Sequence, residues 1–443
     1  MSEEKNIRRL GLSVIAAGLA TNPFFLGYVF SPNARIHSIS LILCILVIQV
    51  LLISAGILLF VKRKTISGKN VFFSAVTVGI VILAIELGLH LLHAIIYGVS
   101  PANIRNRASL SIYKNKEWAE PLLEETNNLQ MEYDQYRGWK TKEFHGKYIN
   151  VDNDGIRRTY NPEYISDTTE TVYVFGGSTV WGSYVRDEGT IPSLLSRKLR
   201  RQSHRFEVYN YGERGYTFTQ NVVHLVLLLR SGHVPNYVIF YEGANDVMSA
   251  YYTGHAETNG LDFELAKAFV WKQQPFLKQI GLLWKESLEQ HSMMYIGIKK
   301  LSILLFGETQ PTWAAKNYDN PELAELAVGI RDNCVATLDF VQRLSATYHF
   351  SYVFVLQPVL LTKIHPTDEE QRVDVITKDQ KLKMLYQDTY RALSNSSLHH
   401  FYDISNIFDD TQETVYSDYC HLSEEGDEKV ADKLSEIVFP APQ

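Results

Sequence analysis

The chain has few features that point to metal, redox or nucleic-acid chemistry. Its three cysteines, Cys44, Cys334 and Cys420, form no CxxC pair, and neither an HExxH nor a GxGxxG motif is present. A zinc site and a dinucleotide-binding fingerprint therefore have no support, and we expect neither metal nor cofactor. The formal net charge of -6, without a basic block among aromatic residues, argues against a nucleic-acid partner. Cys334 and Cys420 would pair only in an oxidising compartment.

Charge is also missing from long stretches of the first hundred residues. Leu10 to Phe30 and Ser38 to Val61 carry no charged residue, and Val71 to Gly98 carries one carboxylate, Glu86. A helix needs roughly 20 mostly apolar residues to cross the hydrocarbon core of a bilayer, and each run is long enough. We therefore predict a membrane anchor of three transmembrane helices in residues 1–99. A cleaved signal peptide would explain the first run alone.

Cationic residues indicate the orientation of these helices. Lysines and arginines precede the first run and separate the second from the third, whereas only Arg35 lies between the first and the second. Cationic loops stay on the cytoplasmic side. The N-terminus is thus predicted to be cytoplasmic, and the chain past residue 100 to be periplasmic or extracellular. The cationic residues are Lys5, Arg8 and Arg9 before the first run, and Lys62, Arg63, Lys64 and Lys69 before the third.

Three ionisable residues share one face of the third predicted helix. Glu86, His90 and His93 are spaced i, i+4 and i+7. Ionisable groups inside a membrane helix are costly and often functional. They also serve as hydrogen-bonding contacts between helices, and we favour that interpretation.

Residues 169–443 alternate between short β-branched or aromatic runs and helix-like stretches. Such alternation predicts a mostly parallel five-stranded sheet with helices on both faces, a three-layer α/β/α domain. Residues 100–168 are expected to connect it to the anchor, and residues 247–319 to form a helical insertion. The expected strands are Thr171–Phe175, Phe206–Tyr209, Tyr237–Tyr241, Tyr352–Leu356 and Phe401–Ile404. The expected helices are about Thr190–Gln202, Thr219–Ser231, Pro321–Thr347, Lys378–Ser394 and Ser423–Ile437.

Polar motifs follow the first three expected strands, where active sites of parallel sheets lie. The first strand ends in Gly176-Gly177-Ser178, a sharp turn that exposes the Ser178 hydroxyl at the start of a helix. The second is followed by Gly212, whose N–H is open to a substrate oxygen. The third is followed by Asn245, whose side-chain amide donates hydrogen bonds. Each pattern alone is also typical of an ordinary turn or helix cap.

A fourth motif, Asp418-Tyr419-Cys420-His421, precedes the last expected helix. A carboxylate three residues before a histidine reaches its ring within one turn of chain. It would fix the tautomer of His421 and stabilise the imidazolium that forms when a serine proton is removed. The alternative is a surface loop with incidental charges.

Together and in this order, the four segments resemble the motif blocks of the SGNH/GDSL hydrolase superfamily, over roughly residues 169 to 440. The resemblance implies a flavodoxin-like fold and a serine esterase with Ser178 as nucleophile, His421 as general base and Asp418 as its partner. It also implies an oxyanion hole formed by the Ser178 and Gly212 N–H groups and the Asn245 side chain. The nucleophile motif is Gly-Gly-Ser-Thr rather than Gly-Asp-Ser, as in many bacterial members.

The substrate is open at this stage. By analogy with membrane-tethered members that face outward, we expect O-acyl groups, above all O-acetyl groups, of envelope or exported polysaccharide. The alternatives are an O-acetyltransferase working with a membrane acyl-donor protein, a lipid esterase, and an inactive glycan-binding scaffold. The insertion at 247–319 suits a lid, a helix resting on the lipid bilayer, or helices packed on the domain. Five tyrosines near the motifs would stack on sugars or cap strands: Tyr211, Tyr216, Tyr241, Tyr251 and Tyr416.

Overall fold

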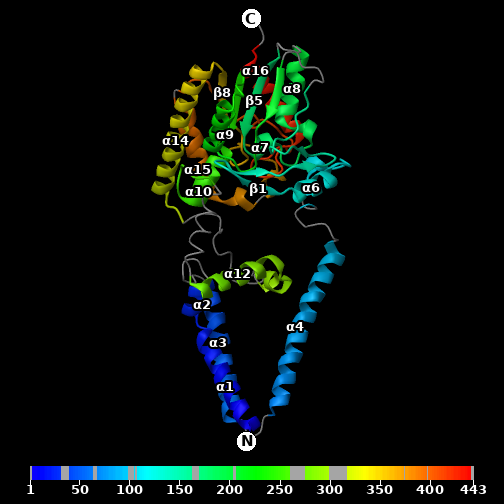
Figure 1. Ribbon diagram of the computed structural model, residues 1–443, viewed down its shortest axis with the longest axis vertical. Helices are drawn as coiled ribbons and strands as arrows, with labels where there is room; N and C mark the ends of the chain where they lie inside the picture. Colours follow the sequence, from blue (N-terminus) through cyan, green and yellow to red (C-terminus); the bar gives the residue numbers. More distant parts are fainter. Residues whose placement is uncertain are drawn as a thin grey trace. The chain divides into compact units, whose positions relative to one another are not determined.

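The structure, a computed structural model, describes residues 2–30, 39–62, 67–97, 104, 107–161, 169–202, 206–259, 275–298, 317–373, 375–396 and 398–440. The chain forms two compact units. One comprises Met1–Ser100 with Ala266–Pro311, and the other Pro101–Leu265 with Thr312–Gln443. The first unit holds the apolar helices and the second holds the sheet (Figure 1).

The second unit is built on a five-stranded sheet in the order β6-β5-β7-β8-β9, with every neighbouring pair parallel. Each strand coincides with one of the expected β-branched and aromatic runs, so the predicted parallel sheet is confirmed. Successive side chains of a strand point to opposite faces, and both faces are buried. The strands are β5 (Glu170–Gly176), β6 (Phe206–Asn210), β7 (Tyr237–Glu242), β8 (Ser351–Leu356) and β9 (Phe401–Asp403).

Helices cover both faces of this sheet (Figure 1). The face with Phe175 and Phe240 carries one hydrophobic cluster, and the face with Val174 and Ile239 carries another. The unit is therefore the predicted three-layer α/β/α domain. The first face packs against α9 (Phe218–Arg230), α10 (Ala244–Thr253), α14 (Asn320–Tyr348) and α15 (Gln380–Ser394), and the second against α8 (Ile191–Gln202) and α16 (Glu424–Val438).

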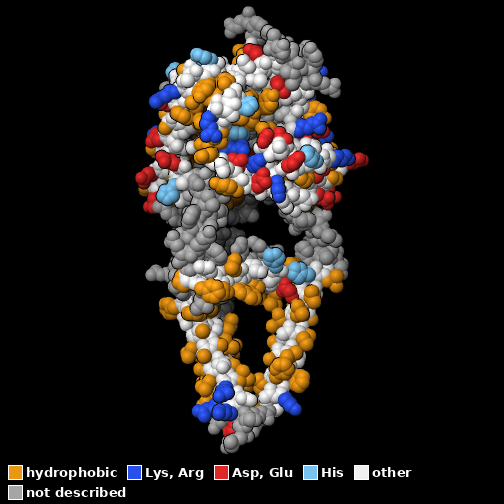
Figure 2. All heavy atoms as spheres, in the orientation of Figure 1, with side chains coloured by type: hydrophobic (Ala, Val, Ile, Leu, Met, Phe, Trp, Pro, Cys, Tyr) orange, Lys and Arg blue, Asp and Glu red, His pale blue; other side chains and the backbone are white. Residues whose placement is uncertain are grey.

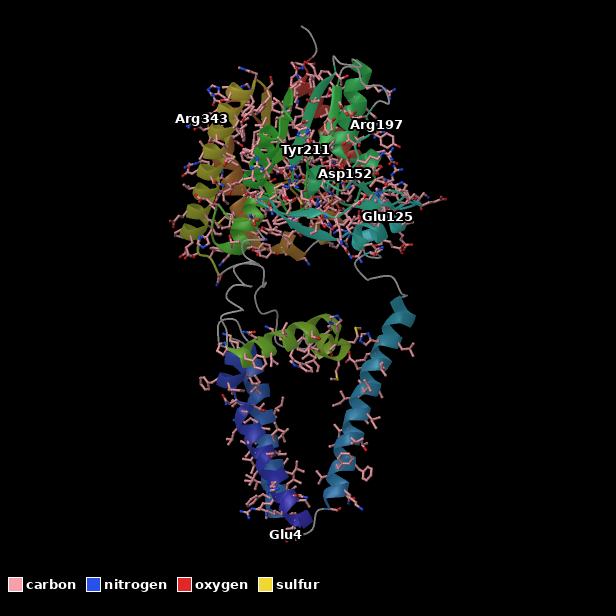
Figure 3. The ribbon with its side chains drawn as sticks, in the orientation of Figure 1. Glu4, Glu125, Asp152, Arg197, Tyr211 and Arg343 are labelled. Atoms are coloured by element: carbon pink, nitrogen blue, oxygen red, sulfur yellow. The ribbon has the colours of Figure 1, made fainter. Side chains whose placement is uncertain are left out.

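The region predicted as a connection is folded onto this domain. Its Leu122, Ile149 and Val151 share a buried cluster with Trp181 of the domain. Glu125 accepts hydrogen bonds from three successive N–H groups, those of residues 147–149 (Figure 3). The region consists of η1 (Ser111–Tyr113), α6 (Ala119–Asn128) and two antiparallel pairs, β1 (Met131–Asp134) with β2 (Gly138–Thr141) and β3 (Phe144–His145) with β4 (Asn150–Val151).

In the first unit, one described helix is long and apolar enough to cross a membrane. It is the part Gly68–Leu91 of α4 (Gly68–Tyr97). The second predicted span forms α3 (Ile39–Val61), of which Ile45–Val61 is a shorter apolar helix. The prediction of a single first helix was wrong. That run divides into α1 (Ser2–Ala20) and α2 (Pro23–Phe30), because Asn22 accepts a hydrogen bond from the N–H of Phe25 and starts a new helix.

The helices α1 and α3 pack closely through glycines. A Cβ on Gly11 would lie 2.9 Å from the carbonyl oxygen of Gly56, which leaves no room for a side chain. Small residues at such contacts are typical of packing between membrane helices. Figure 2 shows hydrophobic side chains along α1, α3 and α4, with Lys and Arg gathered where α1 and α4 begin. Of the orientation residues, Arg35, Arg63 and Lys64 lie outside the described part.

Glu86 and His90 of α4 contact the end of α12 (Phe276–His291), in the same unit. Glu86 accepts hydrogen bonds from the N–H groups of Met293 at 2.5 Å and Met294 at 3.1 Å. His90 Nε2 lies 3.2 Å from the carbonyl oxygen of His291. These contacts agree with a hydrogen-bonding role for both residues. The side chain of His93 lies outside the described part, as do Trp271 and Lys272 of the insertion.

Candidate active site

The turn after β5 places a serine at the start of a helix. Gly177 is extended and precedes α7 (Ser178–Trp181), so Ser178 is its first residue and is partly exposed. A Cβ on Gly177 would collide with Nδ2 of Asn245. Glycine is therefore required here for the Asn245 amide to approach the turn.

A buried arginine from the connecting region holds the chain after this turn. Arg157 is fully buried, and its Nε donates to Asp187 Oδ1 at 2.9 Å. Its Nη1 donates to the carbonyl oxygens of Trp181 and Gly182, and its Nη2 donates to that of Val185. One guanidinium thus joins four points of the segment that follows Ser178. We call this set of contacts the Arg157 clamp.

The structure brings three of the predicted residues into one hydrogen-bonded chain. His421 Nε2 lies 2.7 Å from Ser178 Oγ. His421 Nδ1 lies 2.8 Å and 2.7 Å from the two carboxylate oxygens of Asp418. Because a carboxylate only accepts, Nδ1 carries the hydrogen, and the neutral ring leaves Nε2 free to accept the serine proton. The predicted spacing of Asp418 and His421 therefore gives the expected contact.

Asp418 is buried and is held in its ionised form. Burial alone would raise the pKa of Asp418, but the neighbouring His421 and Arg107 and the hydrogen bond from His421 together hold that pKa well below its usual value. Its carboxylate also accepts from the N–H groups of Cys420 and His421. The loop is closed by a hydrogen bond from the Ser417 N–H to the His421 carbonyl.

Arg107, from the connecting region, was not anticipated from the sequence. Its Nη1 donates to Asp418 Oδ2 at 3.2 Å and to the carbonyl oxygen of Ser417 at 3.0 Å. Its guanidinium lies 3.7 Å from the ring centre of Tyr184, and that ring meets His421 edge-on at 5.1 Å between ring centroids. Nothing in the local sequence around Arg107 distinguishes it from the scattered charges nearby.

Two of the predicted oxyanion donors, Asn245 and Gly212, differ in whether an N–H is left for a substrate. Asn245 Nδ2 donates one hydrogen to the carbonyl of Tyr216 at 2.8 Å, and its second hydrogen is left for another acceptor. The Gly212 N–H instead donates to Asn210 Oδ1 at 3.1 Å. Gly212 lies against α7, where a Cβ would overlap the backbone nitrogen of Trp181. The structure thus gives this glycine a packing position and an acceptor of its own, against the expectation from sequence.

Gly215 lies three residues further along the same loop. It has a φ of +81°, and the contacts of the described residues give its N–H no acceptor. Its neighbour Tyr216 carries the carbonyl that binds Asn245, so this stretch of loop passes beside the Gly177–Ser178 turn.

The five tyrosines considered for sugar stacking are all buried, which removes them from the surface: Tyr211 (Figure 3), Tyr216, Tyr241, Tyr251 and Tyr416.

Among the described residues, one group of side chains has the spacing for a metal ion. It consists of Asp418, Cys420 and His421, whose ligand atoms lie within 4.8 Å of one another. Asp418 is hydrogen-bonded to His421, and His421 is hydrogen-bonded to Ser178, so the group suits a proton relay better than a cation. Cys334 and Cys420 are both buried and free, which corrects the idea that they pair.

The family model for GDSL-like lipase/acylhydrolase proteins matches residues 172–434, more than half of the chain. The chain belongs to this family. It is a serine ester hydrolase of the SGNH/GDSL type. The matched region begins in β5 and ends in α16, so it contains all five strands and the four motifs of this GDSL hydrolase.

Searches of known proteins add two findings about this GDSL hydrolase. No curated protein matches its sequence. Among solved structures, a GDSL family member from Veillonella parvula is 11% identical, with 62% of this chain and 100% of that chain covered and a TM-score of 0.34. An acetylxylan esterase from Geobacillus stearothermophilus is 14% identical, with 64% and 97% covered and a TM-score of 0.30. An acetyl xylan esterase called AlAXEase is 14% identical, with 61% and 100% covered and a TM-score of 0.32.

The Arg157 clamp of the GDSL hydrolase leads to a stability prediction. Arg157→Met should lower the free energy of unfolding by about 3 to 5 kcal/mol, because it leaves the buried Asp187 carboxylate without its cation. The neighbouring exposed Arg158→Met is the control and should change little. Urea unfolding of the full chain in detergent, followed by tryptophan fluorescence, measures both. A loss below about 1 kcal/mol for Arg157→Met, the size of a surface ion pair, would show that the clamp is dispensable.

Proposed function

We propose that this chain hydrolyses O-acyl esters, chiefly O-acetyl groups on envelope or exported polysaccharide, with Ser178, His421 and Asp418 as its catalytic triad. One observation supports the proposal above the others: the hydrogen-bonded chain from Ser178 Oγ through His421 to Asp418, with links of 2.7 Å. This is the arrangement that a serine nucleophile and its general base require.

The mechanism follows from these contacts. Ser178 Oγ attacks the carbonyl carbon of the ester, and its proton passes to His421 Nε2. Asp418, held ionised beside Arg107, stabilises the imidazolium that results. The tetrahedral intermediate collapses when His421 gives this proton to the leaving alcohol oxygen, and the acyl group stays on Ser178. A water molecule, deprotonated by His421, then releases the acid and regenerates the serine.

The oxyanion needs donors aimed at the attacked carbonyl oxygen. The Ser178 N–H, at the first position of α7, and the second amide hydrogen of Asn245 are two such donors. For the third we propose the Gly215 N–H in place of Gly212, because the N–H of Gly212 is taken by Asn210 while that of Gly215 has no acceptor among the described residues. Each donor of this kind is worth roughly 3 to 4 kcal/mol of the barrier.

A polysaccharide ester suits the surroundings of the triad better than a lipid. A cleft of about 520 Å³ is lined by two arginines, four neutral polar residues and five aliphatic residues, and two of these residues, Arg107 and Tyr184, contact Asp418 and His421. A long acyl chain prefers a wholly apolar channel. A sugar alcohol, by contrast, finds hydrogen-bonding partners in such a cleft.

We further propose that the anchor has three transmembrane helices and that the hydrolase domain faces outward. The support is the length of α3 and α4, the apolar runs of α1 and α2, and the cationic residues at one end of this unit (Figure 2). With a cytoplasmic N-terminus and three crossings, residues after 100 lie outside. Polysaccharide outside the cell is then the accessible substrate.

The catalytic assignment predicts the behaviour of two serine variants. The purified full chain should release free acetate from an acetylated oligosaccharide, and Ser178→Ala should abolish this release and labelling by a fluorophosphonate. Ser231→Ala, at the exposed end of α9, is the control and should behave as the wild type. Near wild-type activity of Ser178→Ala would refute the nucleophile. Acetylated acceptor exceeding free acetate, when an unacetylated oligosaccharide is added, would make the protein a transferase that needs an acyl-donor partner.

The oxyanion assignment predicts a kinetic signature for Asn245. Asn245→Ala should lower kcat by about 10²- to 10³-fold with little change in KM, because an oxyanion donor acts mainly in the transition state. Asn153→Ala, in an exposed turn, is the matched control. Steady-state kinetics on a short acetyl ester separate the two parameters. A change confined to KM would assign Asn245 to substrate binding instead.

The orientation is tested by accessibility in intact cells. A cysteine placed at position 69 should resist an impermeant thiol reagent, whereas one placed at position 154 should react, because only the second lies outside. Permeabilised cells provide the control, since both positions should then be labelled. Labelling of position 69 but not of position 154 in intact cells would contradict the proposed orientation and indicate the opposite one.

A further inference from the structure

The cleft beside the triad has a chemical character that the ester chemistry does not explain. It lies between the connecting region and the hydrolase domain, both within one compact unit, and its volume of about 520 Å³ is in the usual range for ligand sites, about 300–1,000 Å³. Its lining includes Arg107, Thr126, Asn127, Tyr184, Arg214 and Ser417. We call it the arginine cleft.

The arginine cleft is attached directly to the catalytic residues. Arg107 donates to Asp418, and Tyr184 packs against the ring of His421. Ser417 immediately precedes Asp418 in the chain. Arg214 precedes Gly215 and lies 5.2 Å from the ring centre of Trp181, at the end of the helix that Ser178 begins. A group bound in this cleft therefore lies next to the ester that Ser178 attacks.

Arg214 has hydrogen-bonding capacity that the described protein does not use. Its Nε is buried and has no hydrogen-bond partner among the described residues. Burial lowers the pKa of Arg214, and the charge of Glu213 raises it. Glu213 itself is occupied by the N–H and hydroxyl of Thr141. A buried donor without a partner is costly, and a ligand would remove that cost.

Arg107 supplies a second guanidinium with donors to spare. Its described hydrogen bonds all use Nη1, which leaves Nε and Nη2. The guanidinium lies over the ring of Tyr184, 3.7 Å from its centre. Burial raises the pKa of Tyr184, while the charges of Arg107 and Arg214 lower it. Both arginines line the same cleft as this tyrosine. The acids nearby, Asp418 and Glu213, already have partners.

We propose that the arginine cleft binds an anionic group of the substrate, a carboxylate or a phosphate, and so selects acylated acidic glycans over neutral ones. The inference rests on the proposed esterase function and deepens it. Guanidinium groups bind carboxylate and phosphate through paired N–H donors, which gives both strength and orientation. The anion would sit on Arg214 and the free edge of Arg107, with the acetylated hydroxyl of the same or the next sugar at Ser178.

The experiment compares three acetylated oligomers with the full chain: a uronic-acid oligomer, a neutral xylose oligomer and a glycerol phosphate oligomer. The wild type should have a kcat/KM at least tenfold higher for an anionic oligomer than for the neutral one. Arg214→Gln should reduce this ratio by about 10- to 100-fold, mainly through KM, and Arg214→Lys should retain part of it. Arg230→Gln, an exposed arginine at the end of α9, is the matched control. A higher kcat/KM for the uronic-acid oligomer would identify the anionic group as a carboxylate, and a higher kcat/KM for the glycerol phosphate oligomer would identify it as a phosphate.

A binding measurement separates this proposal from the esterase proposal. Calorimetry on Ser178→Ala should show binding of the unacetylated acidic oligomer that weakens with salt and is lost when Arg214→Gln is added. If this binding is seen but no ester is cleaved by the wild type, the esterase proposal fails and the anion site stands. Equal cleavage of neutral and acidic esters, or a preference unchanged in a folded Arg214→Gln variant, would overturn the anion site and leave the esterase intact.

Discussion

The site depends on keeping one buried carboxylate ionised. Asp418 is almost wholly buried, and an isolated charge there would take up a proton rather than remain an anion. Its charge is kept by His421, by two backbone N–H groups and by Arg107, whose guanidinium lies over the ring of Tyr184. The orientation of His421, and through it the contact with Ser178, follows from this arrangement.

Ser178 and His421 are 243 positions apart in the chain, and the region before the sheet helps to hold the segments of both. Arg157 fixes the segment after Ser178, and Arg107 fixes the loop of Asp418. Residues 107–157 are therefore a working part of the hydrolase unit, although the family match begins only at residue 172. A chain cut at the start of the sheet would lose both arginines and expose Trp181.

The sequence predicts the sheet well because each strand is a short run of β-branched and aromatic residues, and the three strands β5, β7 and β8 are buried on both faces. Three of the motifs follow the ends of such runs. It predicts less where long-range contacts decide. Nothing local indicates that Arg107 meets Asp418. The hydrogen bond from the Gly212 N–H to Asn210 is different, because it is local: an asparagine side chain often accepts from the N–H two residues further along the chain. The single helix predicted for the first apolar run was wrong for another reason. Composition shows that the run is apolar, but only the cap at Asn22 shows that it forms two helices.

The residues proposed for the chemistry belong to the sheet domain, whereas most residues that line the arginine cleft belong to the connecting region. Ser178 follows β5, Asn245 follows β7, and His421 lies in the loop before α16. The relative positions of these three residues must be preserved whichever ester is the substrate. Seven of the eleven residues that line the arginine cleft come from the connecting region. Substrate choice can therefore vary through the lining of that region without disturbing the triad, which is how one fold serves many esters. Arg107 is the exception, because it lines the cleft and also donates to Asp418, so an anion in the proposed site would share the cation that keeps the Asp418 carboxylate charged.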